Sequence, residues 1–218
     1  MDILFRGLAA GIILVILIFS AILHEVAHGL VAERLGDPTA RLAGRITLNP
    51  KSHIDLNMTI LLPLITFFLS GIILGGAKPV PVDPFNFRDG RKDLALVSLA
   101  GPGTNLIIAI LFALICHLLF PGLSLNAITY SSFLGFFLGN VVYVNLMLCL
   151  FNLLPIPPID GSKIFALLLP EGIASAYMSL QSIGFLILIF FLFAPVGGFS
   201  LMGFISSLLL FSEKLLGL

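Results

Sequence analysis

Charged residues are scarce in this sequence. Only 10% of the 218 residues are charged, and 11 Lys and Arg balance 11 Asp and Glu, so the formal net charge is zero. Without a basic excess, nothing points to a nucleic-acid partner. Hydrophobic residues make up 59% of the chain and the mean hydropathy is +1.16. A soluble domain could not bury so much apolar surface, and the composition therefore predicts a membrane protein.

Cysteine is also scarce, which excludes a disulfide framework. Cys116 and Cys149 both lie inside apolar stretches and are interpreted as small hydrophobic core residues. The sequence shows no soluble domain, no internal repeat and no low-complexity tail. We therefore expect residues 1–218 to form a single membrane domain.

Long apolar segments are what the sequence has instead. They fall near residues 7–31, 59–76, 94–120, 132–154, 173–193 and 199–216. Because a membrane helix needs about 20 apolar residues, we expect an all-α polytopic membrane protein with about five or six transmembrane helices. Residues 1–22 resemble a signal peptide, but the apolar run continues beyond them. We therefore expect an uncleaved first helix.

The links between these segments predict the orientation. Residues 33–57 and 77–93 are rich in Lys and Arg, which are retained on the cytoplasmic side. The apolar segment 59–76 lies between these two basic links and contains Pro63. We expect it to enter and leave by the cytoplasmic side as a re-entrant element, and a full crossing is the alternative.

Alternating polarity in two of the links predicts short interfacial β-strands at 43–48 and 78–82. Pro79 and Pro81 would confine the second strand to an edge. Such an edge could bind an extended peptide by strand addition. An ordinary proline-rich loop is an equally good interpretation.

The strongest motif is His24-Glu25-Val26-Ala27-His28, near the end of the first apolar segment. On a helix, His24 and His28 lie one turn apart on one face, so both imidazoles can bind one ion. Glu25 lies about 100° around the helix, where it can act as a general base in the HExxH arrangement of metalloproteases. Ionisable groups in lipid are costly unless they are paired or functional. The alternative is a helix end whose side chains face lipid headgroups.

A catalytic zinc usually has three protein ligands, and Asp160 is the best candidate for the third. It follows a stretch in which three prolines stop a helix, and non-helical backbone at membrane depth must line a cavity. The alternative for Asp160 is an N-cap of a short helix beginning near Ser162. His117 is expected on the opposite side as a packed histidine. His53 is interpreted either as a cap in its turn or as a polar group at the cavity mouth.

HEVAH combined with NLLPIPPIDG, at residues 152–161, resembles the site-2 protease family of intramembrane zinc metalloproteases. Residues 44–50, 77–82 and 99–105 are also similar to this family, so the resemblance spans nearly the whole chain. Within this family, the sequence resembles the compact prokaryotic type without a PDZ or CBS domain. The small residues of 99–105 are explained by close helix packing. Asn105 could nonetheless face the helix that carries the histidines.

The resemblance implies one zinc ion per chain, held by His24, His28 and Asp160. It implies Glu25 as the general base and Asn152 as a residue that orients or stabilises the reacting group. The implied partners are transmembrane segments of substrate proteins and the lipid bilayer. The implied location is a prokaryotic cell membrane, crossed several times, with the active site toward the cytoplasm.

Two alternative functions stay open at this point. A metal-ion transporter would also place His and Asp in membrane helices, but the last two apolar segments hold almost no ionisable groups. A catalytically silent relative that binds membrane segments is the second alternative, and the intact Glu25 argues against it.

Overall fold

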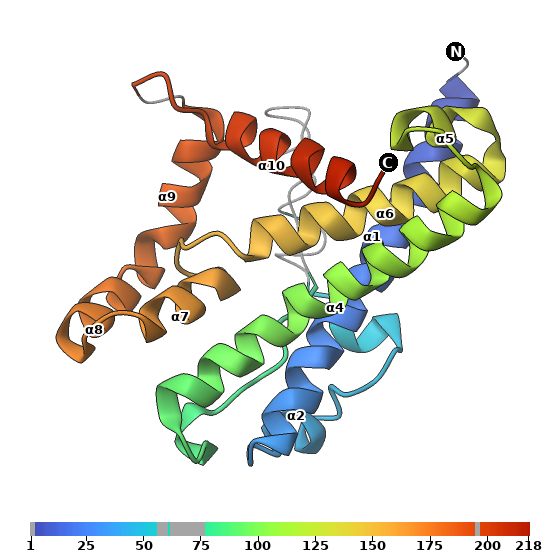
Figure 1. The fold of residues 1–218 in the computed structure, drawn as a ribbon. Coiled ribbons are helices and arrows are strands. Elements are labelled where there is room, and N and C mark those ends of the chain that lie inside the picture. Colours follow the sequence, from blue (N-terminus) through green and yellow to red (C-terminus); the bar gives the residue numbers. More distant parts are fainter. Residues whose placement is uncertain (1–2, 56–60, 62–76, 195–196) are drawn as a thin grey trace.

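The structure, a computed structural model, describes residues 3–55, 61, 77–194 and 197–218. Within these ranges, three helices are long and apolar enough to cross a membrane: α1 (Ile3–Arg34), α4 (Gly90–Leu119) and α6 (Phe133–Asn152). The other helical elements are α2 (Thr39–Leu42), η1 (Pro50–His53), η3 (Pro84–Asn86), α5 (Leu125–Ser131), α7 (Asp160–Leu167), α8 (Glu171–Ser179), α9 (Gln181–Phe193) and α10 (Leu201–Leu215). The predicted helical membrane class is therefore confirmed (Figure 1).

The expected five or six crossings are not confirmed by the described residues. Helices α8 and α9 form a bent pair with an angle of 67°, and they add a fourth span only if the pair counts as one. Helix α9 has 13 residues and α10 has 15. At about 1.5 Å per residue, each falls well short of a hydrocarbon core of about 30 Å.

Neither predicted strand is present. Residues 43–48 form turns and bends after α2, and residues 78–82 form extended chain without a β-ladder. Pro79 and Pro81 have no N–H, Lys78 donates its N–H to the His53 carbonyl (2.7 Å), and Val80 donates its N–H to Glu25 (2.7 Å). Both N–H groups of residues 78–81 are thus used within the protein. The predicted re-entrant segment 59–76 lies, except for Leu61, outside the described residues.

Helices α1 and α4 pack side by side and run in opposite directions (Figure 1). His24 on α1 meets Asn105 on α4, whereas His28, one turn later on α1, meets Val97, earlier on α4. The C-terminal end of α1 therefore lies beside the N-terminal part of α4. The end of α1 and the beginning of α4 therefore lie at the same end of the bundle.

Helix α6 completes the bundle and runs in the same direction as α1. Ile16 lies in one buried cluster with Val141, and Ser20, one turn on, bonds to Asn145. The loop after α6 consequently begins at the end where α1 finishes. This places Asp160 at the same end as His28, as the sharing of one ion requires.

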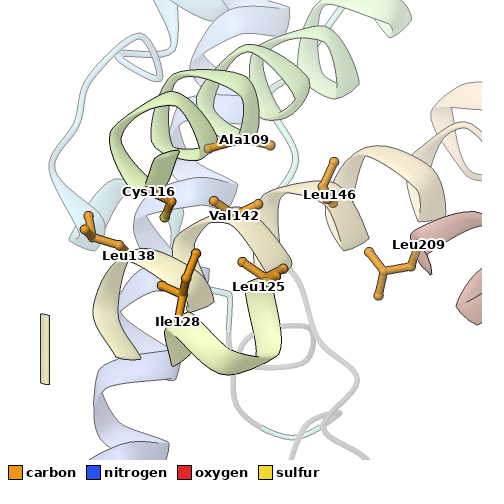
Figure 2. Packing of buried hydrophobic residues seen from close by; sticks show 9 residues of the cluster. Ala109, Cys116, Leu125, Ile128, Leu138, Val142, Leu146 and Leu209 are labelled. Atoms are coloured by element: carbon orange, nitrogen blue, oxygen red, sulfur yellow. The ribbon is translucent and has the colours of Figure 1, made fainter. Parts of the chain in front are cut away.

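Packing at the opposite end of the bundle joins α4, α5 and α6 around the side chains shown in Figure 2. Ala109 and Cys116 of α4 are fully buried there, and small residues of this kind let membrane helices approach closely. Both cysteines are free and buried, as predicted. His117 bonds through Nε2 to the Leu216 carbonyl (2.7 Å), which confirms it as a packed, hydrogen-bonded histidine.

Candidate metal centre

Helix α1 carries His24 and His28, and α7 carries Asp160, so the three residues predicted as ligands come from segments far apart in the chain. The two Nε2 atoms lie 3.0 Å apart. Asp160 Oδ2 lies 3.2 Å from the first and 3.1 Å from the second. Among the described residues, this is the one group of three or more His, Cys, Asp or Glu side chains placed to hold a metal ion.

In each imidazole, a hydrogen bond at Nδ1, the ring nitrogen that does not face Asp160, fixes the orientation of the ring. His28 Nδ1 lies 2.7 Å from the Val97 carbonyl oxygen, which can only accept, so this nitrogen carries the hydrogen. His24 Nδ1 lies 2.6 Å from Asn105 Oδ1. Asn105 in turn donates from Nδ2 to Asn145 Oδ1 (2.9 Å), which keeps its oxygen facing His24. When the two rings are neutral, Nε2 of each therefore presents a lone pair to Asp160.

This donor set fits a zinc ion. Two imidazole nitrogens and a carboxylate oxygen that lie 3.0–3.2 Å apart without a proton between them would repel one another, and a cation among them removes the repulsion. Tetrahedral ligands about 2.0 Å from zinc are separated by about 3.3 Å, close to the spacing here. Two His and one carboxylate also leave a fourth position for water, as in catalytic zinc sites.

Asp160 is the first residue of α7, and the N-cap of that helix is Ile159. The alternative of Asp160 as an N-cap is therefore wrong. Its other oxygen, Oδ1, accepts a hydrogen bond from Lys163 Nζ (3.1 Å). Burial favours the neutral acid, whereas the positive charge of Lys163 acts in the opposite direction and lowers the pKa of Asp160. Lys163 was not predicted, although its spacing of three residues on a helix was the available signal.

The segment 99–105 acts on the site through two residues. A β-carbon added at Gly101 would lie 2.5 Å from ring atoms of both His24 and His28. The expectation of close helix packing thus holds, and here the close approach leaves room for the rings of the two predicted ligands, His24 and His28. Asn105 does face the ligand helix, and it is fully buried.

Behind Asn105 lies a buried polar network that the sequence did not reveal. Asn145 is 0% exposed and donates from Nδ2 to Ser20 Oγ (2.9 Å) and to the Val141 carbonyl (2.9 Å). Asn105, Asn145 and Ser20 come from α4, α6 and α1. Buried amides without partners are costly, so this closed network holds the three helices in one register.

The site opens on a cavity of ≈ 550 Å³, whose lining includes Glu25, Val80, Val97, Asn152, Asp160 and Lys163. This volume is within the range of about 300–1,000 Å³ that is usual for small-molecule binding sites. Asn152 donates one Nδ2 hydrogen to the Leu148 carbonyl (2.9 Å), and a second hydrogen remains on the same nitrogen. Glu25 accepts from the Val80 N–H through Oε2, at 2.7 Å. The structure thus brings all five predicted site residues to one cavity.

His53 does not line this cavity. It is the last residue of η1, is 2% exposed, and bonds through Nε2 to the Thr47 carbonyl (2.8 Å). Its position favours the interpretation as a residue that closes its own turn.

Comparison with curated proteins adds independent findings. The chain is 38% identical over 190 residues to "Putative zinc metalloprotease YwhC" of Bacillus subtilis, which covers 87% of this chain and 83% of that protein. It is 32% identical over 155 residues to "Putative zinc metalloprotease Rip2" of Mycobacterium tuberculosis, covering 70% of this chain and 56% of the relative. An archaeal relative, "Putative zinc metalloprotease MJ0611" of Methanocaldococcus jannaschii, is 30% identical over 103 residues, which are 46% of this chain and 49% of that protein. No protein-family model matches the chain, and no solved structure matches it.

Proposed function

This chain belongs to the site-2 protease family of zinc metalloproteases, and from this premise we propose that it hydrolyses peptide bonds in or near transmembrane segments of other proteins. The observation that carries the proposal is the convergence of His24, His28 and Asp160 beside Glu25 in one cavity. Two of these ligands lie within the candidate span Gly7–Arg34. A site built into an apolar helix is suited to substrates that are themselves embedded in lipid.

The metal assignment follows from the donor set. His24, His28 and Asp160 would hold one zinc ion per chain. When bound, zinc acts as a Lewis acid and lowers the pKa of water. Val97 and Asn105 hold the two imidazoles in the tautomer that leaves Nε2 as the ligand atom.

The protein's own side chains carry the proton. Glu25 takes a proton from water as the water oxygen adds to the peptide carbonyl carbon, and returns it to the amide nitrogen as the carbon–nitrogen bond breaks. Asn152 directs its second Nδ2 hydrogen to the carbonyl oxygen, which gains negative charge in the transition state. The products are a new carboxyl group and a new amine.

We further propose that the site faces the cytoplasm of a prokaryotic cell, in a single multi-pass membrane domain. Arg34 is the last residue of α1 and Arg91 is the second residue of α4, and both lie at the end of the bundle that carries the site. Basic residues flanking membrane helices are retained on the cytoplasmic side, which supports this orientation. A metal-ion transporter would need a series of metal-binding groups along a path across the membrane. The part of the chain that the structure describes holds a single group of side chains placed to bind a metal ion, which favours the protease.

The experiment uses the full chain in proteoliposomes together with a transmembrane reporter peptide, and mass spectrometry identifies the products. We expect cleavage within or next to the reporter's apolar segment, zinc at one per chain, and loss of cleavage when a chelator removes the zinc. The same peptide without the enzyme is the control. A zinc-loaded protein that cleaves no membrane segment would contradict the proposal and favour the silent relative.

A further inference from the structure

The proposed general base is held by the backbone of a distant segment. Val80 N–H donates to Glu25 Oε2 at 2.7 Å, across 55 positions in the sequence. Val80 belongs to residues 77–87, which we call the strap, a mainly extended segment that includes η3 and forms one wall of the cavity. Among the residues that the structure describes, the Glu25 carboxylate accepts only this hydrogen bond, so the Val80 N–H decides which way one of its oxygens points.

The sequence around Val80 makes this donor rigid. Pro79 and Pro81 fix their own φ angles, and the residue before a proline is confined to extended backbone. Val80 is 8% exposed, and its side chain packs against the α1 helix at Gly29, where an added β-carbon would lie 3.3 Å from Val80 Cγ1. The Val80 N–H is therefore presented to Glu25 from a backbone with little freedom.

Both ends of the strap are tied to the chain that follows α1. At the first end, the Lys78 carbonyl accepts from Arg45 Nη2 (2.6 Å). At the second end, Asp37 accepts from the Asp83 N–H through Oδ2 (2.8 Å) and from Asn86 Nδ2 through Oδ1 (2.8 Å). Asp37 is fully buried, and bonds to an ionised acceptor are about twice as strong as neutral ones.

Metal ligands and strap have separate supports. His24, His28 and Asp160 are oriented by Asn105, Val97 and Lys163, all outside the strap. A change in the strap should therefore move the base and leave the metal ligands in place.

We propose that the strap positions Glu25 for proton transfer through the Val80 N–H, and that Asp37 is a positioning residue that holds the strap. The inference rests on the proposed function, in which Glu25 is the general base. A general base must lie within hydrogen-bond reach of the proton it takes. A displacement of about 1 Å can cost about 100-fold in rate.

Val80→Pro and Val80→Ala form a matched pair that tests this. Both remove the isopropyl group, and only proline removes the N–H. With the transmembrane reporter in proteoliposomes, we expect Val80→Pro to lower kcat by about 10- to 100-fold relative to Val80→Ala. KM and zinc content should stay the same in the two variants. Equal kcat values, or a loss confined to KM or zinc, would overturn the inference.

The Glu25→Asp background separates positioning from a general disturbance of the cavity wall. The Asp side chain is one methylene shorter than Glu, so its carboxylate cannot both accept from the Val80 N–H and reach the position of the Glu25 carboxylate at the substrate. If the N–H acts through Glu25, Val80→Pro will change kcat little in this background, because coupled residues are non-additive. The same fold loss in both backgrounds would show that Val80 acts on something other than the base.

Asp37→Asn tests the anchor, and Asp83→Asn is its control. Asp37→Asn replaces one acceptor oxygen by an NH2 group that cannot accept from Asp83 N–H or Asn86. Asp83→Asn also removes one acid in the same region but keeps the backbone N–H that Asp37 binds. We expect a lower kcat with unchanged zinc content only for Asp37→Asn. Wild-type protein that fails to cleave the reporter would refute the proposed function, whereas cleavage with no effect of Asp37→Asn would refute the positioning role alone.

Discussion

The metal side and the base side of the cavity are held in different ways, although His24 and Glu25 are neighbours in the chain. The imidazoles of His24 and His28 are oriented from inside the bundle by α4. Glu25 points away from that face and is oriented by Val80, in the strap. Successive residues on a helix are rotated by about 100°, so one turn of α1 meets two environments. The comparison indicates that metal binding and base orientation can be lost separately.

Glu25→Gln is expected to have the largest effect and to show this separation most clearly. The amide cannot take a proton, so kcat should fall by about 10²- to 10⁴-fold. Zinc content should remain one per chain, because the ligand atoms and their partners are unchanged. Cleavage of the transmembrane reporter and metal analysis of the same preparation provide the two measurements. Undiminished cleavage would rule out Glu25 as the base.

Gly101→Ala should damage the metal side instead. The new methyl group would lie 2.5 Å from ring atoms of His24 and His28, so the rings must move. We expect zinc affinity to fall by about 100-fold or more, beyond the usual loss for a change in a residue that supports a ligand. Gly103→Ala is the control, because nothing lies within 4 Å of a β-carbon there. Equal zinc affinity in the two variants would contradict the close approach of α4.

Asn105→Ala should give a smaller loss on the same side. It removes the acceptor that holds His24 Nδ1, and partners of this kind are worth about 10- to 100-fold in metal affinity. Asn140→Ala is a matched control, since this amide bonds to the Phe136 carbonyl on its own helix (2.7 Å). Competition with a zinc chelator measures both affinities. A similar loss in the two variants would indicate a general packing defect.

The smallest expected effect concerns acid stability on the base side. Burial would raise the pKa of Asp37, but bonds from Thr39, Asp83 and Asn86 outweigh it and lower the pKa below its ordinary 3.8. The unfolded chain therefore takes up a proton here at a higher pH than the folded protein does. The stabilisation is complete above about pH 5 and is lost as the pH falls through 3.8 and below.

Thermal unfolding of chelator-treated protein in detergent checks this, because no metal is then released on acidification. The wild-type protein should unfold at a higher temperature than the Asp37→Asn variant at pH 6, and the difference should narrow toward pH 3. A difference that is independent of pH would show that the charge of Asp37 contributes nothing.

Much of the site could be predicted from sequence because its spacing is local. His24, Glu25 and His28 occupy one turn of a helix, and helix geometry alone places the two imidazoles together. Asp160 could be inferred because prolines end α6 before it and a charged group there needs a partner. The class of protein followed from the apolar segments. The number of crossings stays a prediction: the described residues hold three candidate spans, or four if α8 and α9 count as one, and the bend between these two helices leaves no signal in the hydropathy.

The sequence by itself determined which groups are available for the proposed chemistry: an apolar chain must satisfy its backbone as helices in lipid, and a His-Glu-His turn with a distant Asp offers a candidate ligand set and a candidate base. Tertiary structure alone decided what orients them. Each orienting group lies far along the chain from the residue that it holds. The Val97 carbonyl lies 69 positions from His28, Asn105 lies 81 positions from His24, and the Val80 N–H lies 55 positions from Glu25. Two of these groups, the Val97 carbonyl and the Val80 N–H, belong to the backbone, which is identical in every residue and carries no signature. Only the packing of α1 against α4 and the strap could select them, and for Asn105 this packing decided between the two roles that the sequence allowed.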